Sequence, residues 1–434
     1  REPDYSPVSY ESELYPSLAA ELGTGMSVTY SRRPRVPGES FLPMMIRTLG
    51  SGSNGLGYYM YHGGTTPSDG FHFLSEGFGL PNKSYDYQAP IREFGNTGNG
   101  FYGLKLINLF LQHYGTDLAP LHTVLPETNA GITPSDTTTL RYAVRSDGAQ
   151  GFVFMHNYQD HIKTPDLKDL QLKIKTGTGA IMFPLKGTFN LKSGISVIFP
   201  FNQQINGLNL RSATVQPLCS FDNGGQHYRV FVSFDGIQPE FAFSGNLRAQ
   251  VRNAGTVLYN GNTVITGTPD HAFEFSVSNN HFLVIPFKTA LNAYLAGRPG
   301  RQLLILSDAL MLENNGKIEL ISMGKESVDM VIYPPVKNLE SENARVLPLP
   351  SPRKFFSEWT ISVDRITPDI VFTHPQERRY VMDAKNMDLS VLNDVYIKFD
   401  YRGDRAVCML NGEMATDNLY TSEPWLIGLK RYGS

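Results

Sequence analysis

Residues 139–158 have the sequence Thr-Leu-Arg-Tyr-Ala-Val-Arg-Ser-Asp-Gly-Ala-Gln-Gly-Phe-Val-Phe-Met-His-Asn-Tyr, and they decide the fold class of the chain that follows. Polar and apolar side chains alternate at residues 139–145, as they do in a half-buried strand. Asp147-Gly148 is a turn signal, and a second apolar run occupies residues 151–158. Two such runs around an Asp-Gly pair predict a β-hairpin. We therefore expect antiparallel β-structure beyond about residue 121.

The period of two continues after this hairpin. Four strands of regular spacing are expected at 170–175, 180–184, 187–191 and 194–200. Such spacing is typical of an antiparallel sandwich. Three more alternating runs occur at 228–234, 273–277 and 318–322. The sequence leaves open whether these runs form a second sandwich or extend the first.

Residues 338–354 interrupt this pattern. They are rich in Pro, Glu and Ser and weakly apolar, which is typical of a linker. Alternation then resumes at 357–363 and 395–401, so one more β-domain is expected at the end of the chain.

The first 115 residues show a different pattern, in which short apolar runs alternate with helical spacing. Residues 40–50 are expected to form a helix ending on Gly50, and residues 55–61 a buried parallel strand. An apolar stripe over 99–113 predicts a second helix, closed by Gly115. With a strand that carries Glu21, this is a β-α-β-α order typical of α/β folds. Two such units cannot close an eight-stranded barrel alone.

Composition narrows the classes of function. The chain has 434 residues, which suggests roughly two to four domains. A net charge of −3 with scattered Lys and Arg offers no basic surface for nucleic acid. The longest apolar runs, such as residues 303–306, are far shorter than the roughly 20 residues of a membrane span. The chain begins with Arg1, so any targeting signal is expected upstream.

The two cysteines, Cys219 and Cys408, lie far apart in the sequence. Burial as small apolar side chains is the simplest interpretation, and a disulfide or a pair of metal ligands is the alternative. The compartment of the protein is therefore not fixed by its cysteines.

Glu21 is the first candidate for chemistry, in the stretch Ala-Glu-Leu-Gly-Thr-Gly at 20–25. Hydrolysis of a glycosidic bond needs two carboxyl groups, and a retaining enzyme holds them about 5 Å apart and uses one as the nucleophile. A carboxylate at a strand end, followed by Gly23 and Gly25, leaves room for a sugar ring. A solvated glutamate before a turn is the alternative.

Aromatic hydroxyls follow in two clusters. They are Tyr58, Tyr59, Tyr61, Tyr85 and Tyr87. A tyrosine offers a flat apolar face and a hydroxyl group, which suits one face and the hydroxyls of a sugar. In a buried strand, tyrosine also packs in the core with its hydroxyl bound to the backbone, so both interpretations stay open.

No cofactor is expected. His62 lies beside Gly63-Gly64, but no second histidine occurs at metal-ligand spacing. No Gly-x-Gly-x-x-Gly follows an expected strand, and the chain has neither a P-loop nor a Gly-x-Ser-x-Gly motif. Nucleotide cofactors and serine hydrolysis therefore have no support.

Three blocks resemble the last part of the catalytic barrel in glycoside hydrolase family 35 β-galactosidases. They are 21–30 (Glu-Leu-Gly-Thr-Gly-Met-Ser-Val-Thr-Tyr), 58–65 (Tyr-Tyr-Met-Tyr-His-Gly-Gly-Thr) and 84–93 (Ser-Tyr-Asp-Tyr-Gln-Ala-Pro-Ile-Arg-Glu), in the order and spacing of the family. Residues 151–158 also resemble the sandwich that follows the barrel in large bacterial members. Residues 410–418 resemble their galactose-binding-like jelly rolls.

The resemblance implies roles for several residues. Glu21 matches the nucleophile on the seventh barrel strand, and Tyr59 matches a strand-eight tyrosine that hydrogen-bonds galactose. Tyr87 matches a second galactose-contacting tyrosine, with Tyr85 in the same block. Met26 stands where many members have a substrate-facing tryptophan.

Two further features depart from the family. Thr66-Pro67 replaces the usual Asn-Phe, which affects the sugar and aglycone that the resemblance implies. The acid/base glutamate of the family follows an asparagine on the fourth strand, and no Asn-Glu precedes Glu21. We therefore expect six strands before Arg1, which would supply this group, and no appreciable hydrolysis by the chain alone.

These observations predict an α/β plus all-β fold. We expect the C-terminal portion of a (β/α)8 TIM barrel at 1–118, a β-sandwich at 119–215, a second β-rich region at 216–337 and a galactose-binding-like jelly roll at 338–434.

The function that the resemblance implies is that of a retaining exo-β-galactosidase. It would release terminal β-D-galactose from β-galactoside oligo- or polysaccharides through a covalent galactosyl-enzyme intermediate. A periplasmic or cell-surface location is expected from such relatives. The alternatives are a β-glycosidase of other sugar preference and a non-catalytic carbohydrate-binding or cell-surface scaffold protein, in which Trp359 or Trp425 could stack on a sugar.

Overall fold

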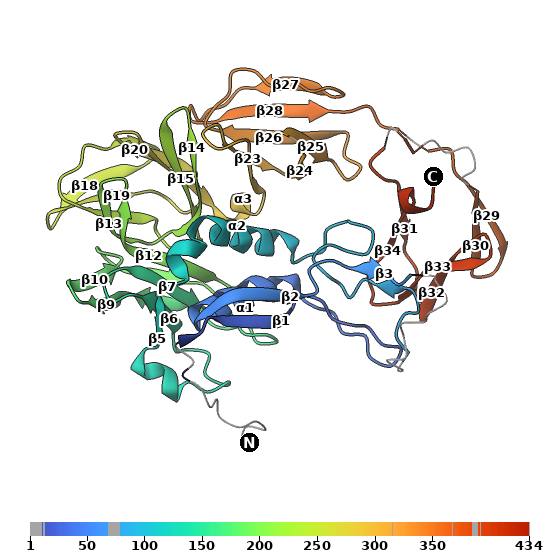
Figure 1. The fold of residues 1–434 in the computed structure, drawn as a ribbon, viewed down its shortest axis with the longest axis horizontal. Coiled ribbons are helices and arrows are strands. Elements are labelled where there is room, and N and C mark those ends of the chain that lie inside the picture. The colour runs from blue at the N-terminus through green and yellow to red at the C-terminus, as the bar shows by residue number, and fades with distance from the viewer. Residues whose placement is uncertain are drawn as a thin grey trace. The chain divides into compact units, whose positions relative to one another are not determined.

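The computed structural model describes residues 11, 14–67, 79–314, 316–366, 368–383, 389–390 and 392–433 (Figure 1). Contacts divide the chain into two compact units, each assembled from separated stretches. The first contains Arg1–Gly25, Val36–Tyr61 and Thr97–Leu303, and the second contains Met26–Arg35, His62–Asn96 and Leu304–Ser434. Antiparallel strands dominate both units, which confirms the all-β part of the expected fold. The four consecutive domains stay a prediction.

The first unit begins with two parallel strands and two helices. β1 (Ser17–Gly23) pairs in parallel with β2 (Ser53–Tyr59). Between them the chain forms the 3-10 helix η2 (Gly38–Ser40) and α1 (Phe41–Gly50), and α2 (Phe101–Leu118) follows β2. The expected order of strand, helix, strand and helix is confirmed for this segment.

The expected end of α2 was wrong. The helix continues past Gly115 to Leu118, where the backbone N–H of Ala119 donates to the Gly115 carbonyl at 2.9 Å. Leu118 and Leu121 are buried in the core beneath the helix. Their burial stabilises the extra turn, so tertiary packing outweighs the helix-ending preference of glycine.

A single apolar core joins the helices to the first β-sheet. Its buried members are Phe41, Leu42, Met45, Ile46, Leu49, Leu104, Ile107, Phe110, Leu118, Leu121, Phe152, Phe154 and Ile198. Full burial of each such side chain contributes about 1.5–3 kcal/mol. Because the core includes strands of the sheet, the αβ segment and the sheet stabilise each other.

Arg145 binds this junction together by hydrogen bonds. Its side chain is 1% exposed and donates to the carbonyls of Leu49 (2.9 Å), Ser53 (3.2 Å), Leu118 (3.2 Å) and Leu121 (2.8 Å). Leu49 and Leu118 lie in the last turns of α1 and α2, where carbonyls lack helical partners and a cation is favoured. One buried guanidinium thus caps both helices.

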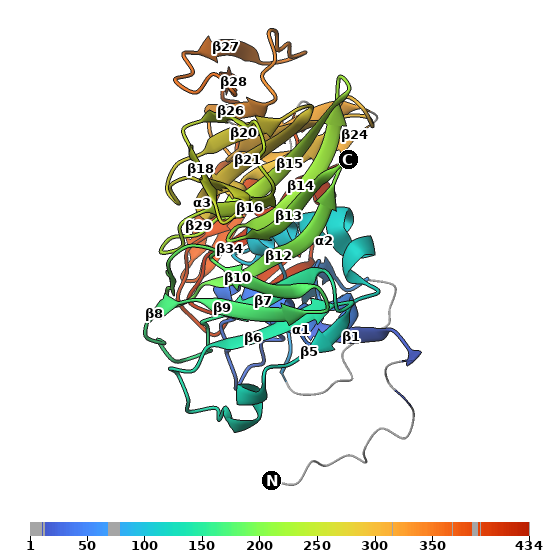
Figure 2. The ribbon, with the colours of Figure 1, turned by 90° about the vertical axis from the view of Figure 1, so that its left-hand side faces the viewer.

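Two sheets form the rest of the first unit (Figure 2). The eight-stranded sheet has the order β18 (Gly255–Tyr259), β19 (Asn262–Thr266), β16 (Glu240–Ser244), β13 (Leu208–Ala213), β12 (Ser196–Ile205), β7 (Gly151–His156), β6 (Arg141–Ser146) and β5 (His122–Val124). The five-stranded sheet has the order β14 (Gln216–Asn223), β15 (Gln226–Ser233), β21 (Asn280–Pro286), β20 (Phe273–Val277) and β17 (Gln250–Arg252).

An aromatic core lies between these sheets. It includes Phe231, Phe241, Phe243, Phe275 and Phe282, whose ring centroids lie 4.6–6.4 Å apart in the recorded pairs. β16, β18 and β19 belong to the same sheet as β6 and β7. The strands between residues 216 and 286 therefore extend the first sandwich, whereas the run at 318–322 lies in a separate two-stranded sheet of the second unit.

The hairpin expected at residues 139–158 is confirmed. β6 and β7 are antiparallel with Ser146 opposite Gly151. Asp147 Oδ1 accepts the backbone N–H groups of Ala149 and Gln150 at 2.8 and 2.9 Å. Gly148 has a φ of 92°, which glycine adopts without strain.

Smaller elements complete the first unit. They are η3 (Glu127–Gly131), β8 (Leu167–Leu170) paired with β11 (Phe189–Leu191), β9 (Leu172–Thr176) paired with β10 (Gly179–Phe183), α3 (Phe287–Ala290) and β22 (Ala293–Ala296).

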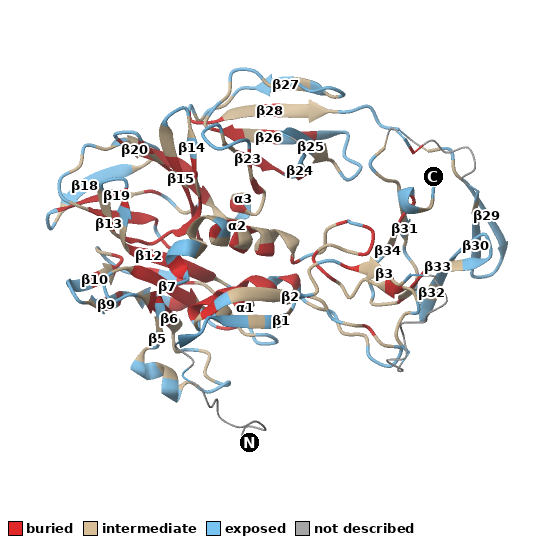
Figure 3. Ribbon diagram, viewed as in Figure 1, coloured by how far each residue is buried: buried red, intermediate tan, exposed pale blue. Residues whose placement is uncertain are grey.

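The second unit contains one larger sheet and several strand pairs. In the sheet, β23 (Leu303–Ser307), β26 (Ser327–Tyr333), β28 (Ser357–Ser362) and β27 (Arg345–Leu349) are successive neighbours. The pairs are β3 (Gly64–Thr65) with β4 (Ser84–Tyr85), β24 (Leu310–Asn314) with β25 (Lys317–Ile321), β29 (Val371–Gln376) with β30 (Arg379–Asp383), β31 (Tyr396–Phe399) with β34 (Trp425–Gly428), and β32 (Arg405–Leu410) with β33 (Glu413–Leu419); η4 (Lys430–Tyr432) follows. Figure 3 shows the exposed course of β29 and β30.

The prediction of a linker at 338–354 was wrong for the residues at its centre. β27 occupies residues 345–349 and pairs with β28, with Val346 opposite Ile361. The composition suggested a linker partly because of Pro348, but proline is tolerated on this edge strand, where its missing N–H removes no hydrogen bond between strands. The polar residues around β27 lie in mostly exposed segments on either side of this strand.

Candidate active site

Glu21 lies at a β-bulge in β1. Residues 19–22 of β1 pair with residues 56–58 of β2, so β1 holds one residue more than its partner. Ala20 and Glu21 therefore oppose the single residue Gly57. Bulges of this kind change the direction of a side chain.

Burial around the bulge shows which way Glu21 points. Leu22 and its partner Tyr58 are partly buried and pack against the helix core. Ala20 and Glu21 are both exposed. Since a strand presents alternate residues to opposite faces, the two bulged residues point away from the helices. Glu21 thus faces the side of β1 and β2 opposite to the helix core.

Gly57 permits this bulge. A Cβ atom at position 57 would lie 2.3 Å from the carbonyl oxygen of Ala20 and 2.6 Å from that of Ala19. Gly55 differs, because a Cβ there would meet only the Cδ2 end of Leu18, at 2.7 Å. A side chain at 57 would push β1 away, whereas one at 55 displaces a flexible leucine.

Tyr59 ends β2 beside the turn that follows Glu21. Its side chain is 39% exposed, and its carbonyl accepts the N–H of Gly25 at 3.4 Å. The buried Thr24 hydroxyl donates to the Met60 carbonyl at 2.5 Å. The turns after both strands are therefore tied together at their carboxyl ends, where α/β folds place their ligands.

Two of the expected tyrosines serve the core instead. Tyr58 donates its hydroxyl to Asn108 Oδ1 at 2.8 Å and lies 5.3 Å from the ring of Tyr61. Burial, with the neighbouring Tyr61, raises the pKa of Tyr58 to about 12. Tyr61 also packs on Phe101 of α2. For this pair the packing interpretation is confirmed.

Tyr85, Tyr87 and Met26 come together in the second unit. The rings of Tyr85 and Tyr87 stack with centroids 4.2 Å apart, and the N–H of Met26 donates to the Tyr87 carbonyl at 2.6 Å. Met26 is 45% exposed. Tyr87 and Gln88 both have positive φ, at 48° and 57°. The strained turn fixes the direction of both rings.

Asp86 holds this turn in place, a role that sequence reasoning missed. Its carboxylate accepts two bonds from Arg92 Nε at 2.8 and 2.9 Å, and the N–H groups of Gln88 at 3.0 Å and Glu93 at 2.9 Å. Burial alone would lower the pKa of Arg92, but the Asp86 and Glu423 carboxylates outweigh it and raise that pKa. The position of Asp86 between Tyr85 and Tyr87 was the available signal.

Two buried carboxylates anchor the same loop, and neither was foreseen. Glu93, 2% exposed, accepts hydroxyl hydrogen bonds from Thr65 (2.5 Å), Ser84 (2.6 Å) and Thr416 (3.0 Å). Burial raises its pKa, and the three hydroxyls act against that rise.

Asp417 is fully buried. It accepts the N–H groups of Asn82 (2.7 Å), Lys83 (2.8 Å) and Ser84 (3.0 Å) and pairs with Arg405 at 2.8 Å. All of these contacts lie within the second unit. They bind residues 82–93 to β33 and its neighbours, and no local sequence pattern marks partners more than 300 residues apart.

Residues 4–110 match the family model of glycosyl hydrolases family 35. These matched residues, 4–110, are called the family-35 segment below. The family-35 segment contains β1, α1, β2 and the loop with Tyr85 and Tyr87, together with most of α2. A comparison with curated proteins gives no match.

Within the family-35 segment, the structure forms two groups of the expected residues. Glu21 and Tyr59 lie on neighbouring strands of the first unit, and Met26, Tyr85 and Tyr87 lie together in the second. Each group is defined by contacts within its own unit.

Metal ligands and membrane spans were also sought. In the described residues no group of three or more His, Cys, Asp or Glu could hold a metal ion. Cys219 and Cys408 are free thiols, the first of them buried. None of the helices in the described ranges is long and apolar enough to cross a membrane.

Proposed function

We propose that the protein is a retaining β-galactosidase in which Glu21 is the nucleophile. Glu21 would attack the anomeric carbon, the bond to the leaving oxygen would break, and the galactosyl ester would then be hydrolysed by water with retention. Tyr59 would bind a ring hydroxyl, and Tyr87, Tyr85 and Met26 are proposed as substrate-contacting residues from the resemblance to the family alone.

The observation that carries the proposal is the direction of Glu21. In a family-35 segment, a bulge turns this carboxylate to the face of two parallel strands opposite to the helix core, one residue before their pairing ends at Leu22-Tyr58 and Gly23-Tyr59. β2 itself contains no Asp or Glu, so in the proposal the acid/base group comes from another part of the barrel.

Hydrolysis of a panel of 4-nitrophenyl glycosides tests the proposal. We expect the full-length protein to prefer β-galactoside and to release β-galactose first, as seen by NMR of the anomeric proton. Release of α-galactose first would rule out a retaining mechanism, and preference for another β-glycoside would change the sugar but keep the mechanism. Exo action predicts galactose alone as the first product from an oligosaccharide. Secretion stays a prediction.

A non-catalytic carbohydrate-binding protein is the second candidate, because an exposed Glu21 is also what such a protein would show. Galactoside titrations of the 434-residue chain and of its Glu21→Gln variant separate the two. Affinity that is unchanged by Glu21→Gln, without hydrolysis, would favour the binding protein.

A further inference from the structure

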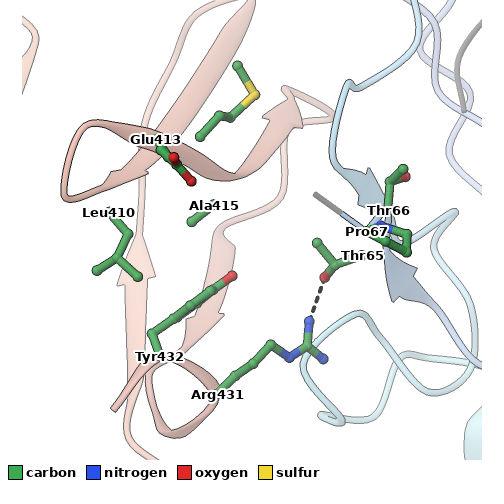
Figure 4. Close-up of a pocket in the computed structure, with 9 residues that line it drawn as sticks. Thr65, Thr66, Pro67, Leu410, Glu413, Ala415, Arg431 and Tyr432 are labelled. Atoms are coloured by element: carbon green, nitrogen blue, oxygen red, sulfur yellow. Dashed lines mark hydrogen bonds between the residues drawn. The ribbon is translucent and has the colours of Figure 1, made fainter. Parts of the chain in front are cut away.

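A pocket of about 480 Å3 opens in the second unit (Figure 4). Its walls come from β3 and the two residues that follow it, from the β32–β33 hairpin, and from η4. It contains none of the residues proposed for the chemistry of Glu21. Its volume lies within the range of small-molecule sites.

Arg431 supplies a fixed set of donors at one side of the pocket. Its guanidinium donates to Thr65 Oγ1 at 2.5 Å and to the Glu93 carbonyl at 2.8 Å, and it lies 4.9 Å from the centroid of the Phe94 ring. A guanidinium has five N–H groups, so these two bonds leave others for a ligand. Thr65 is itself held by Glu93. Arg431 is therefore oriented before any ligand arrives.

Glu413 supplies acceptors at the other side, as Figure 4 shows. It follows the two-residue turn Asn411-Gly412, whose φ values are 51° and 94°, and pairs with Leu410 across the hairpin. Two positive φ values in an Asn-Gly pair make a rigid type I′ turn. Across the described part of the chain, the Glu413 carboxylate has no ion pair or hydrogen bond. Its carboxylate oxygens are therefore available to a ligand.

Apolar surface separates the two charged groups. Leu410 and Ala415 of the hairpin and the ring of Tyr432 line the pocket between them. Opposite charges at its two sides disfavour a ligand with a strong net charge of either sign. A ligand with hydroxyl groups on its rim and a C–H face satisfies the donors, the acceptors and the apolar surface together.

We propose that this pocket binds one hexose unit of a glycan, as an accessory site separate from the Glu21 site. Hydroxyls of the hexose donate to the Glu413 carboxylate and accept from Arg431, while its C–H face lies on Leu410 and Tyr432. The choice of a sugar rather than another neutral polar ligand rests on the proposed function. An accessory site of this kind holds a polymer by a second contact and raises its effective concentration.

The test is isothermal titration calorimetry of a β-galacto-oligosaccharide into the 434-residue chain with Glu21→Gln, so that hydrolysis cannot consume the ligand. Glu413→Ala removes the acceptor, and Ala415→Tyr fills the pocket. We expect each change to weaken binding at one site at least about tenfold, as the loss of a charged hydrogen bond does. Glu319→Ala is the matched control, since Glu319 is an exposed glutamate on hairpin strand β25 of the same unit, and it should leave affinity unchanged.

Several results would overturn the inference. It would be contradicted by equal affinity in the Glu21→Gln chain and in its Glu413→Ala, Ala415→Tyr and Glu319→Ala variants. Absence of saturable binding, or binding of glycine in preference to the sugar, would contradict it as well. The proposed function would instead be contradicted if the protein showed no galactoside hydrolysis that depends on Glu21. In that outcome, Glu413→Ala would still weaken sugar binding at the pocket. If the pocket proposal alone is wrong, Glu413→Ala leaves both sugar binding and hydrolysis unchanged.

Discussion

Glu21 in the first unit and Glu93 in the second are two glutamates of one family-35 segment with opposite surroundings. Glu93 is buried, and three hydroxyl groups donate hydrogen bonds to its carboxylate. Glu21 is exposed at a bulge, on the strand face opposite to the helix core. A satisfied carboxylate fixes the backbone around it, whereas an exposed one at a strand end is free to react. The same substitution should therefore have different effects at the two positions.

Glu21→Gln carries the largest expected effect. Removal of the nucleophile should lower kcat for aryl β-galactosides by about 10³-fold or more, since the amide cannot form the covalent intermediate. Stability should change by less than about 0.5 kcal/mol, because the residue is exposed. Steady-state kinetics and urea unfolding measure the two quantities, and wild-type kcat in the variant would remove Glu21 from the mechanism.

Glu93→Gln should reverse this pattern. The amide presents N–H groups to hydroxyls that now donate to a carboxylate, so we expect a loss of about 1–3 kcal/mol in unfolding free energy. Glu413→Gln, at an exposed glutamate of the same unit, is the matched control and should cost less than about 0.5 kcal/mol. Equal stability of both variants would show that the Glu93 network does not hold the loop.

The bulge can be tested by two alanine substitutions in β2. Gly57→Ala places a Cβ 2.3 Å from a backbone oxygen of β1, and we expect about 1–3 kcal/mol of destabilisation with loss of activity as Glu21 changes direction. Gly55→Ala meets only the end of Leu18 and should be within about 1 kcal/mol of wild type. Thermal unfolding and kcat compare them. Similar behaviour of the two would mean that the bulge does not direct Glu21.

The last prediction concerns a buried lysine in the first unit. Lys105 of α2 lies 3.3 Å from the centroid of the Tyr294 ring, and its Nζ has no hydrogen-bond acceptor in the described ranges. The ring favours the charged form, but burial outweighs it and lowers the pKa of Lys105 to about 7.

The sign of the pH dependence follows from that pKa. Between pH 7 and about 10 the unfolded chain binds more protons than the folded chain, so stability should rise with pH across this window. Lys105→Met should remove the dependence. A slope that is identical in the variant would assign the titration to another group.

Local secondary structure could be predicted from the sequence, whereas contacts between residues far apart in the chain could not. The hairpin of β6 and β7, the parallel pair of β1 and β2, and the strand ends near Glu21 and Tyr59 follow from period, turn residues and glycines. Tyr58 and Tyr59 could not be told apart, because the packing of the helix core against one face of β2 decides which of the two is buried. The α2 end and the strand in 338–354 were missed because tertiary packing overrode Gly115 and Pro348.

The anchors of the second loop were beyond sequence reasoning for another reason. Thr416 and Asp417 bind residues 82–93 from more than 300 positions away, and a single sequence carries no signal for such pairs. The role of Arg145 could not be predicted either. Its four hydrogen-bond acceptors are backbone carbonyls, which every residue has, so no residue type marks them in the sequence.

Covalent trapping of the nucleophile tests the central claim most directly. A 2-deoxy-2-fluoro-β-galactoside with a good leaving group forms a slowly hydrolysed ester with the nucleophile of a retaining enzyme. After incubation of the full-length protein and proteolysis, mass spectrometry should find one fluorogalactosyl group, on the peptide that contains Glu21, and none in Glu21→Gln. A label on any other residue, or one that persists in the variant, would contradict the assignment.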